Sequence, residues 1–481
     1  MPRRSLLDCL RTLMMLAVAA MGAPAGALAQ SASPSPGPVA DAFPPALAQQ
    51  IDAAAKQVLA ASGVPSASVA IVREGRIAYL QAYGQARLSP AVDAQPRMQY
   101  SIGSISKQFT AAAVLLLAER RKLSLDDPVA RYLPGLTRAE EVTLRMLLSH
   151  TSGYEDYWPE DYVMTSLMVP TTAQHILDVW GKKPLNFDPG TKWQYSNTNY
   201  VIAGRIVEQV SGVPLLAFLE NNIFAPLAME KVYDSDASHL PATDPEGYYR
   251  HALGPLRPAP QEGAGWMFAA GELAMPAHDL ALWDISLIDR SLLKPASYAQ
   301  MLTPVLLKDG TSSGYGLGVF LGRRDGHAVI EHDGEVSGFV SENLVFPEDR
   351  AAIVVLTNED ASPAAITIGR RLTPLVLGLR PPAPTSAESQ ALAIFLGLED
   401  GRLNRKLFTP LCNAYFTAQA IDDFATSLKP LGPPLSFTQQ KQEARGGMIF
   451  RSFTAEFPDR KLTVTTYEMP DGKLEQYLVI P

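Results

Sequence analysis

The sequence has few cysteines, no block of basic residues and no long apolar run after its N-terminus. Its 41 basic and 49 acidic residues give a net charge of −8, and nothing resembles a basic track for a phosphate backbone. We therefore do not expect nucleic acid as a partner. No later segment reaches the roughly 18 consecutive apolar residues of a transmembrane helix. With 47% hydrophobic residues, the chain has the composition of a water-soluble globular protein.

The N-terminus has the organisation of a secretion signal. A basic region (residues 3–11) precedes an apolar stretch (13–20), and Ala27 and Ala29 supply the small side chains that signal peptidase requires. An apolar stretch this short does not span about 30 Å of hydrocarbon. We therefore expect cleavage after Ala29 and a periplasmic or secreted protein. The paired arginines fit both the general secretory and the twin-arginine route.

Cysteine and metal-binding patterns are equally sparse. Cys9 falls within the predicted signal, which leaves Cys412 without a partner for an internal disulfide. The seven histidines are scattered, and neither His-Glu-x-x-His nor paired Cys/His spacing occurs. No Walker or Gly-x-Gly-x-x-Gly phosphate loop occurs either. We therefore expect neither a metal nor a cofactor.

Changes in composition divide the chain into five parts. A stretch rich in Ser, Pro, Gly and Ala follows the signal, and a proline-rich polar stretch near residue 380 is typical of a linker. The expected parts are a signal peptide (1–29), a flexible leader (30–44), a large domain (45–378), a linker (379–390) and a C-terminal domain (391–481).

The large domain carries strand patterns at both of its ends. A helical pattern near its start is followed by a hairpin that turns at 74–75, and helical and loop-rich sequence fills the middle. Further strands are expected at 314–322, 328–330, 339–346 and 352–357. This order predicts the α+β class, with one antiparallel sheet built from both ends of the domain.

The C-terminal domain has a simpler pattern. Helical periodicity runs from 405 to 429, and alternating strand patterns follow from residue 450, with a turn at 471–472. We expect a helix packed on an antiparallel sheet. Because the domain holds no cluster of nucleophile, base or metal ligands, we interpret it as a structural or docking module.

The first chemically suggestive motif is Ser104-Ile105-Ser106-Lys107, which opens an apolar helical stripe. Ser104 would lie at the helix N-terminus, with Lys107 one turn later on the same side, where free N–H groups and the helix dipole favour negative charge. A serine placed so can become a nucleophile. The motif also fits a helix cap with Lys107 in solvent, and it recurs at 291–294, where no apolar helix follows. A Gly-x-Ser-x-Gly match at 310–314 precedes a strand pattern, which argues against a nucleophile there.

A second motif, Tyr195-Ser196-Asn197, lies on a loop before a helical run and can present a phenol and an amide to a cleft. Tyrosine becomes a base only where cations lower its pKa from about 10, and we expect Lys107 to supply that charge. Asn197 would bind a substrate amide or carbonyl. Alone, the motif equally fits a turn with a capping asparagine.

A third motif, His332-Asp333-Gly334, lies between two strand patterns. Gly334 would let substrate approach the backbone closely, and the amide of Glu335 could donate a hydrogen bond to an oxyanion. Alone, a histidine at a strand end is more often structural.

An aromatic cluster follows residues 150–153 of the sequence. It consists of Tyr154, Tyr157, Trp158 and Tyr162. Such a cluster can wall a pocket for an apolar acyl group, or it can pin a loop by packing.

Together and in this order, the three motifs resemble those of the serine β-lactamase and penicillin-binding protein superfamily. The resemblance is to the class C side, shared with DD-peptidases, D-aminopeptidases and some esterases. It covers about residues 45–375 and implies a β-lactamase/transpeptidase-like fold. Supporting phrases occur at 147–153, 189–190, 269–271, 279–280 and 315–319.

The resemblance implies an acyl-enzyme mechanism and a role for seven positions. They are the nucleophile Ser104, the proton-transfer pair Lys107 and Tyr195, the substrate contacts Asn197, His332 and Gly334, and the backbone oxyanion donors of Ser104 and Glu335. Two positions depart from the pattern. His332 replaces the lysine typical of class C β-lactamases, and Glu335 stands where a small residue is usual, which weakens the case for β-lactam hydrolysis.

We therefore expect an exported serine hydrolase that acts on an amide, ester or lactam carbonyl of a small molecule or peptide. DD-peptidase, D-aminopeptidase, esterase and β-lactamase types remain open, because they share the acylation residues and differ in pocket shape and deacylation rate. The alternative is a catalytically silent protein on the same fold that binds cell-wall peptides or a partner.

Overall fold

The computed structural model describes residues 43–160, 162–378, 386–457 and 460–480. The predicted signal peptide (1–29) and all but the end of the predicted leader (30–44) lie outside these residues. So does most of the predicted linker (379–390).

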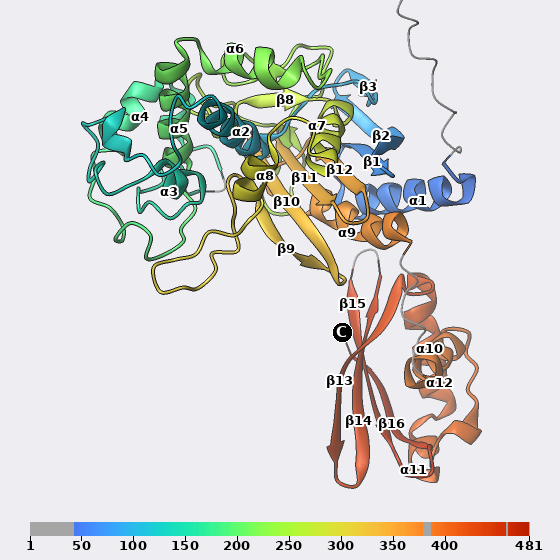
Figure 1. The fold of residues 1–481 in the computed structure, drawn as a ribbon. Coiled ribbons are helices and arrows are strands. Elements are labelled where there is room, and N and C mark those ends of the chain that lie inside the picture. The colour runs from blue at the N-terminus through green and yellow to red at the C-terminus, as the bar shows by residue number, and fades with distance from the viewer. Residues whose placement is uncertain (1–42, 161, 379–385, 458–459, 481) are drawn as a thin grey trace, which may run out of the picture. The chain divides into compact units, whose positions relative to one another are not determined.

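A seven-stranded antiparallel sheet forms the centre of the large domain, in the order β3-β2-β1-β12-β11-β10-β9 (Figure 1). Its strands are β1 (Ser66–Arg73), β2 (Arg76–Leu88), β3 (Ala91–Asp93), β9 (Phe320–Arg324), β10 (His327–Val336), β11 (Phe339–Phe346) and β12 (Ala351–Thr357). The first and last parts of the domain meet where β1 pairs with β12, from Ala67 opposite Thr357 to Val72 opposite Ala352. The prediction of one antiparallel sheet built from both ends is confirmed.

The central strands are buried on both faces, which explains their nearly continuous apolar sequence. On β1, Val69 and Ile71 pack with α1 (Pro45–Ser62) and α9 (Ala364–Leu377), and the alternate residue Val72 belongs to the larger core on the opposite face. Figure 1 shows α1 and α9 on one side of these strands and α7 (Ala277–Asp289) on the other.

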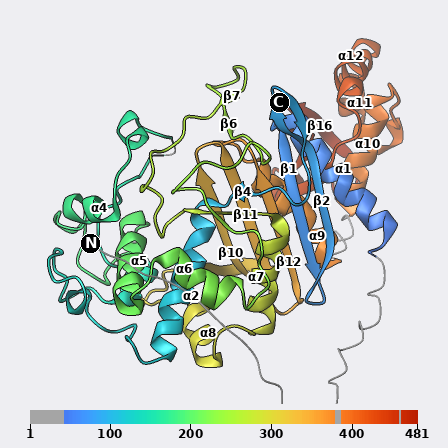
Figure 2. The same cartoon turned by 90° about the horizontal axis from the view of Figure 1, so that it is seen from above.

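A helical and loop-rich region lies between the two halves of the sheet in sequence. Figure 2 shows α2, α4, α5 and α6 beside the sheet on the side of β10. Besides α7, the helices of this region are α2 (Ser106–Glu119), α3 (Leu144–Leu148), α4 (Ala173–Val179), α5 (Asn197–Ser211), α6 (Leu215–Leu219) and α8 (Pro295–Met301). Short 3-10 turns are η1 (Gly103–Ile105), η2 (Val129–Arg131) and η3 (Thr165–Met168), and η4 (Glu220–Phe224) is a π-helical turn. Short strands are β4 (Tyr100–Ser101), β5 (Tyr233–Asp234), β6 (Tyr248–Tyr249), β7 (Arg257–Pro258) and β8 (Leu273–Met275).

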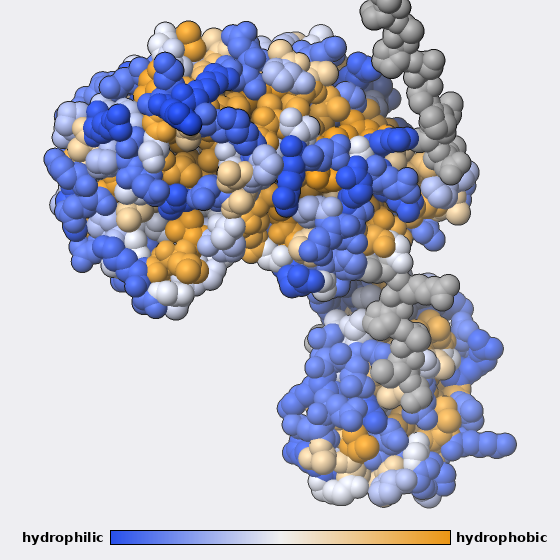
Figure 3. All heavy atoms as spheres, in the orientation of Figure 1, coloured by the Kyte–Doolittle hydropathy of each residue, from blue (hydrophilic) through white to orange (hydrophobic). Residues whose placement is uncertain are grey.

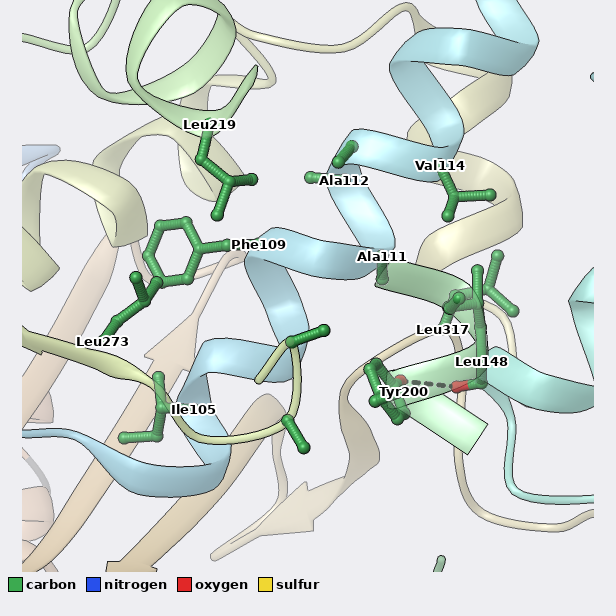
Figure 4. Packing of buried hydrophobic residues seen from close by; sticks show 14 of the residues in the cluster. Ile105, Phe109, Ala111, Ala112, Val114, Leu148, Tyr200, Leu219, Leu273 and Leu317 are labelled. Carbon is green, nitrogen blue, oxygen red and sulfur yellow. Dashed lines mark hydrogen bonds between the residues drawn. The ribbon is translucent and has the colours of Figure 1, made fainter. Parts of the chain in front are cut away.

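Helix α2 passes through the interior of this region. Every residue from Ser106 to Leu117 is buried, so this helix has no solvent face. Figure 4 shows Phe109 of α2 packed near Leu219 and Leu273, and its ring centroid lies 4.7 Å from that of Trp283. Tight packing on all sides fixes the position of the first turn of α2, where the Ser-x-x-Lys motif lies.

One predicted strand of the large domain is largely wrong. The pattern at 314–322 predicts a strand, but β9 begins only at Phe320. Glycines at 314 and 318 adopt positive φ, and Gly318 donates its N–H to Leu148 O. The chain therefore turns here and bonds to neighbouring loops before it enters the sheet.

The C-terminal domain has its own apolar core beneath a four-stranded antiparallel sheet, in the order β13-β14-β15-β16. Its strands are β13 (Ser436–Arg445), β14 (Met448–Glu456), β15 (Lys461–Glu468) and β16 (Leu474–Ile480). Its helices are α10 (Ser386–Glu399), α11 (Pro410–Tyr415) and α12 (Ala418–Leu428), with 3-10 turns η5 (Arg405–Leu407) and η6 (Lys429–Leu431). Cys412 is a buried free thiol in this core.

Two details of this domain differ from expectation. The single helix expected over 405–429 is broken, because Thr417 adopts an extended conformation and its side chain caps α12 by accepting the N–H of Ala420. Helix α10 begins at Ser386, inside the predicted linker, so the domain starts earlier than residue 391.

The hydropathy of the surface and of the helices bears on the expectation that no membrane span follows the N-terminus. In the view of Figure 3, hydrophilic side chains are spread over both domains with apolar ones between them. Among the described residues, no single helix is long and apolar enough to cross a membrane. Helix α5 followed by α6 and η4 meets the length and composition criteria only as a pair bent by 69°.

The packing of α2 leads to a stability prediction. Phe109→Ala removes a fully buried ring and should lower the free energy of unfolding of the large domain by about 3–5 kcal/mol. Leu253→Ala is the control, because Leu253 is 97% exposed and its truncation should cost less than about 0.5 kcal/mol. All five tryptophans belong to the large domain, so urea unfolding followed by tryptophan fluorescence reports on it. Equal urea midpoints for the two variants would contradict the assigned packing.

Candidate active site

The structure brings Ser104 and Lys107 into direct contact. Ser104 lies in η1, and Lys107 lies in the first turn of α2, which continues from η1. Lys107 Nζ is 2.8 Å from Ser104 Oγ and 2.7 Å from the carbonyl oxygen of Ala270. The serine predicted as a nucleophile therefore has an amine at hydrogen-bonding distance.

The buried position of Lys107 changes its acidity. The side chain is completely buried, and no described carboxylate forms a salt bridge with it. Burial lowers the pKa of Lys107 to about 7, while the negative charges of Asp156, Asp333 and Glu272 act in the opposite direction. A substantial fraction of the amine is thus unprotonated at neutral pH and able to accept the proton of Ser104.

Tyr195 lies on the loop before α5 and completes this group. Lys107 Nζ lies 4.9 Å from the centre of its ring, and the nearby Ser104 hydroxyl favours the ionised form of the phenol. The expectation that Lys107 lowers the pKa of Tyr195 is wrong. Burial raises the pKa of this phenol well above its usual value, and the charge of Asp156 adds to the effect. Tyr195 is therefore protonated at rest and is suited to donate a proton.

Asn197 is the first residue of α5 and is tied to a carboxylate that the sequence analysis did not identify. Its backbone N–H donates to Asp156 Oδ1 at 3.0 Å, and its side-chain Nδ2 donates to Asp156 Oδ2 at 3.3 Å. Burial raises the pKa of Asp156 to about 6, although these hydrogen bonds and Lys107 favour the charged form. Asp156 lies 41 positions before Asn197, so no local sequence pattern joins the two. Its place shortly after residues 150–153 was the one signal in the sequence that pointed to it.

His332 lies on β10 beside the cavity and is uncharged. Its Nε2 is 2.9 Å from Tyr315 Oη, and its Nδ1 is 2.5 Å from the carbonyl oxygen of Asp333. Burial lowers the pKa of His332 to about 4, against the opposing charge of Asp333. Both ring nitrogens are bonded within the protein, and the ring carries no positive charge for a substrate carboxylate. Its assignment as a substrate contact stays a prediction.

Two glycines allow the end of β10 to meet the backbone that precedes Ser104. A Cβ on Gly334 would lie 2.0 Å from the carbonyl oxygen of Ile102. Gly103 has a φ of +52°, and a Cβ there would lie 2.7 Å from the backbone nitrogen of Glu335. The predicted oxyanion donors, the amides of Ser104 and Glu335, therefore belong to two backbones in close contact.

His150 is a central residue that the sequence analysis noted only within a supporting phrase. Its fully buried ring lies 4.3 Å from the ring of Tyr195 and 4.9 Å from that of Tyr315, and its Nδ1 accepts the N–H of Ser196 at 3.2 Å. Burial holds the pKa of His150 well below its usual value. The neutral ring therefore serves to position Tyr195. Because 45 residues separate the two, no local pattern could reveal this contact.

A cavity of about 600 Å³ opens onto these residues. Of the side chains predicted to act in the site, Ser104, Tyr195, Asn197 and His332 line it. Lys107 does not line it, but its amine is hydrogen-bonded to Ser104. Of the predicted aromatic wall, Tyr157, Trp158 and Tyr162 line the cavity. Tyr154 does not, because its hydroxyl is turned toward the carbonyl oxygen of Thr137. Among the residues that the structure describes, the cavity included, no group of three or more His, Cys, Asp or Glu could hold a metal ion.

The large domain is similar to known proteins. The chain matches the family described as Beta-lactamase over residues 51–375. The putative penicillin-binding protein PbpX of Bacillus subtilis is 31% identical over 272 residues, which cover 55% of this chain and 65% of that protein. The match therefore spans slightly less than two thirds of that relative.

Two solved structures are similar. A D-stereospecific amidohydrolase from Streptomyces sp. has a TM-score of 0.58 and 27% identity, over 66% of this chain and 96% of that one. The octameric penicillin-binding protein homologue from Pyrococcus abyssi has a TM-score of 0.62 and 21% identity, over 90% of this chain and 100% of that one, a likeness of fold. With a family match over most of the large domain and a sheet of the expected topology, the chain belongs to the β-lactamase family of serine hydrolases.

Proposed function

We propose that the protein is an exported serine hydrolase that cleaves an amide or ester through an acyl-enzyme on Ser104. The observation that carries the proposal is the buried Lys107 amine, which is hydrogen-bonded to Ser104 and whose pKa burial lowers to about 7. A lysine that only caps a surface helix would be solvated and fully protonated. The proposed export rests on the signal-like sequence of residues 1–29.

Each step follows from the protonation states of the site. The neutral Lys107 amine takes the hydroxyl proton as Ser104 Oγ bonds to the substrate carbonyl carbon, and the backbone amides of Ser104 and Glu335 are the proposed donors to the resulting oxyanion. The bond to the leaving nitrogen or oxygen then breaks. Tyr195 passes a proton to the leaving group and recovers one from the Lys107 ammonium. Water hydrolyses the acyl-enzyme by the reverse proton transfers and releases the acid.

The charge of the cavity narrows the substrate class. No described lining residue is Lys or Arg, and His332 is neutral. β-Lactams and peptides that end in D-Ala-D-Ala carry a carboxylate close to the reacting bond, and such a group would find no cation on the lining. We therefore favour amidase or esterase action over carboxypeptidase or β-lactamase action. Similarity to a D-stereospecific amidohydrolase supports this choice.

The nucleophile can be tested directly. Ser104→Ala should lower hydrolysis of a p-nitrophenyl ester by at least about a thousandfold, because among the described residues no other hydroxyl is hydrogen-bonded to the Lys107 amine. Ser291→Ala and Ser312→Ala are matched controls on exposed residues and should keep wild-type rates. A fluorophosphonate should label Ser104, as read by peptide mass spectrometry. Full activity of Ser104→Ala would contradict the role of Ser104 as the nucleophile. Absence of both hydrolysis and labelling in the wild type would favour the silent binding protein.

The acidity of Lys107 predicts a pH profile. For a neutral p-nitroanilide, kcat/KM should rise with pH and level off above an apparent pKa of about 7, because the unprotonated amine is the reactive form. Lys107→Arg keeps the charge but does not deprotonate, so it should be inactive across the profile. A wild-type profile that is flat from about pH 5 to 9 would contradict the role of Lys107 as the base.

Carboxylate-bearing substrates test the proposed class. We expect kcat/KM for a neutral p-nitrophenyl ester to exceed the values for nitrocefin and for a D-Ala-D-Ala peptide by about tenfold or more, since the lining offers their carboxylates no cation. The three rates should be measured with the same enzyme and corrected with Ser104→Ala. Faster turnover of the peptide or of nitrocefin would reverse the preference proposed here.

A further inference from the structure

Asp156 lies in the wall of the cavity with its carboxylate held in a fixed orientation. The N–H groups of Trp158 and Asn197 donate to Oδ1 at 3.2 and 3.0 Å, and the Asn197 side chain donates to Oδ2 at 3.3 Å. All three donors are neutral. Within the described parts of the chain, no salt bridge reaches Asp156. The charge of Lys107 lowers the pKa of Asp156, but the Lys107 amine is hydrogen-bonded to Ser104 and not to this carboxylate.

Other carboxylates strengthen the negative charge of the same cavity. Glu160, Asp333 and Asp360 belong to its lining, and none of the three forms a salt bridge among the described residues. The Oε2 atom of Glu160 is buried and has no hydrogen-bond partner in the described structure. A concave surface with several carboxylates and no lysine or arginine on its lining concentrates cations and repels anions.

The remaining lining is aromatic. Tyr157, Trp158, Tyr162, Trp193 and Phe320 contribute rings to the cavity. Aromatic faces attract organic cations through their quadrupole, and they also accept apolar substituents. A fixed carboxylate among aromatic rings therefore suits an ammonium group on a carbon skeleton. It suits a bare metal ion less well, since metal ions require several oxygen or nitrogen ligands.

We infer that Asp156 is a specificity-determining residue that binds an ammonium group next to the reacting carbonyl of the substrate. Amino-acid amides and esters with a free amine have this chemistry. The inference rests on the proposed function, because it specifies the acyl group that Ser104 receives. The amine takes no part in bond making: the C–N or C–O bond to the leaving group breaks, water supplies the hydroxyl, and the amino acid is released.

The test uses two substrates that differ in one group. Alanine p-nitroanilide, in each enantiomer, carries an ammonium where isobutyryl p-nitroanilide carries a methyl group of similar size. For the wild type at neutral pH, kcat/KM of the preferred alanine enantiomer should exceed that of the isobutyryl substrate by roughly tenfold or more. Asp156→Asn should bring this ratio close to one. Because the ratio compares two substrates of the same variant, a change that the substitution causes in Lys107 or Asn197 affects both rates alike.

Two further variants make the readout specific. Asp156→Glu keeps the negative charge and should retain part of the preference for the ammonium substrate. Asp178→Asn is the matched control, because Asp178 is a carboxylate on α4 that pairs with Lys182 outside the cavity. This control should leave the substrate ratio unchanged.

Four outcomes decide the matter. A wild-type ratio near one overturns the inference. An equal loss on both substrates in Asp156→Asn also overturns it, since Asp156 would then act only by positioning Asn197. If neither substrate nor a p-nitrophenyl ester shows hydrolysis that depends on Ser104, the proposed function itself fails. A ratio near one in Asp156→Asn, with the wild-type ratio kept in Asp178→Asn, supports the inference.

Discussion

The burial of one amine determines how this site works. Removing an ammonium from water without a carboxylate partner is unfavourable, and a protein can relieve that cost by releasing the proton. Lys107 has no exposed surface, and its described hydrogen-bond partners are the uncharged Ser104 Oγ and Ala270 O. The same burial that would destabilise a charged lysine therefore creates a base next to a serine at neutral pH.

The fold keeps this amine in place through contacts on every side of it. Helix α2 is buried all round, so its first turn cannot tilt toward solvent. Gly318 approaches that turn closely enough that a Cβ would lie 2.9 Å from Lys107 O, and Gly103 and Gly334 bring η1 against β10. These glycines come from segments more than 200 residues apart. The sheet that joins both ends of the domain is what brings them together.

The sequence predicts those features that depend on local pattern. The hairpin of β1 and β2, the strands β10 to β12 and the Ser104–Lys107 pair follow from apolar runs and from the spacing of one helical turn. Contacts between residues far apart in the sequence could not be predicted. Asp156 is hydrogen-bonded to Asn197, 41 positions away, and His150 packs on Tyr195, 45 positions away. The predicted strand from residue 314 fails because backbone bonds to distant loops turn the chain. The direction of the Tyr195 pKa shift depends on desolvation, which a sequence does not display.

Asp156 and Lys107 are coupled, and this coupling links substrate binding to the base. The negative charge of Asp156 raises the pKa of Lys107 and so works against the effect of burial. An ammonium group bound at Asp156 would bring one positive charge into the same enclosed space and would offset the charge of the carboxylate. This change would lower the pKa of Lys107 further and increase the fraction of the free amine. A substrate recognised through its amine would thus increase the fraction of unprotonated Lys107 next to Ser104. A substrate with a carboxylate in the same place would reduce that fraction.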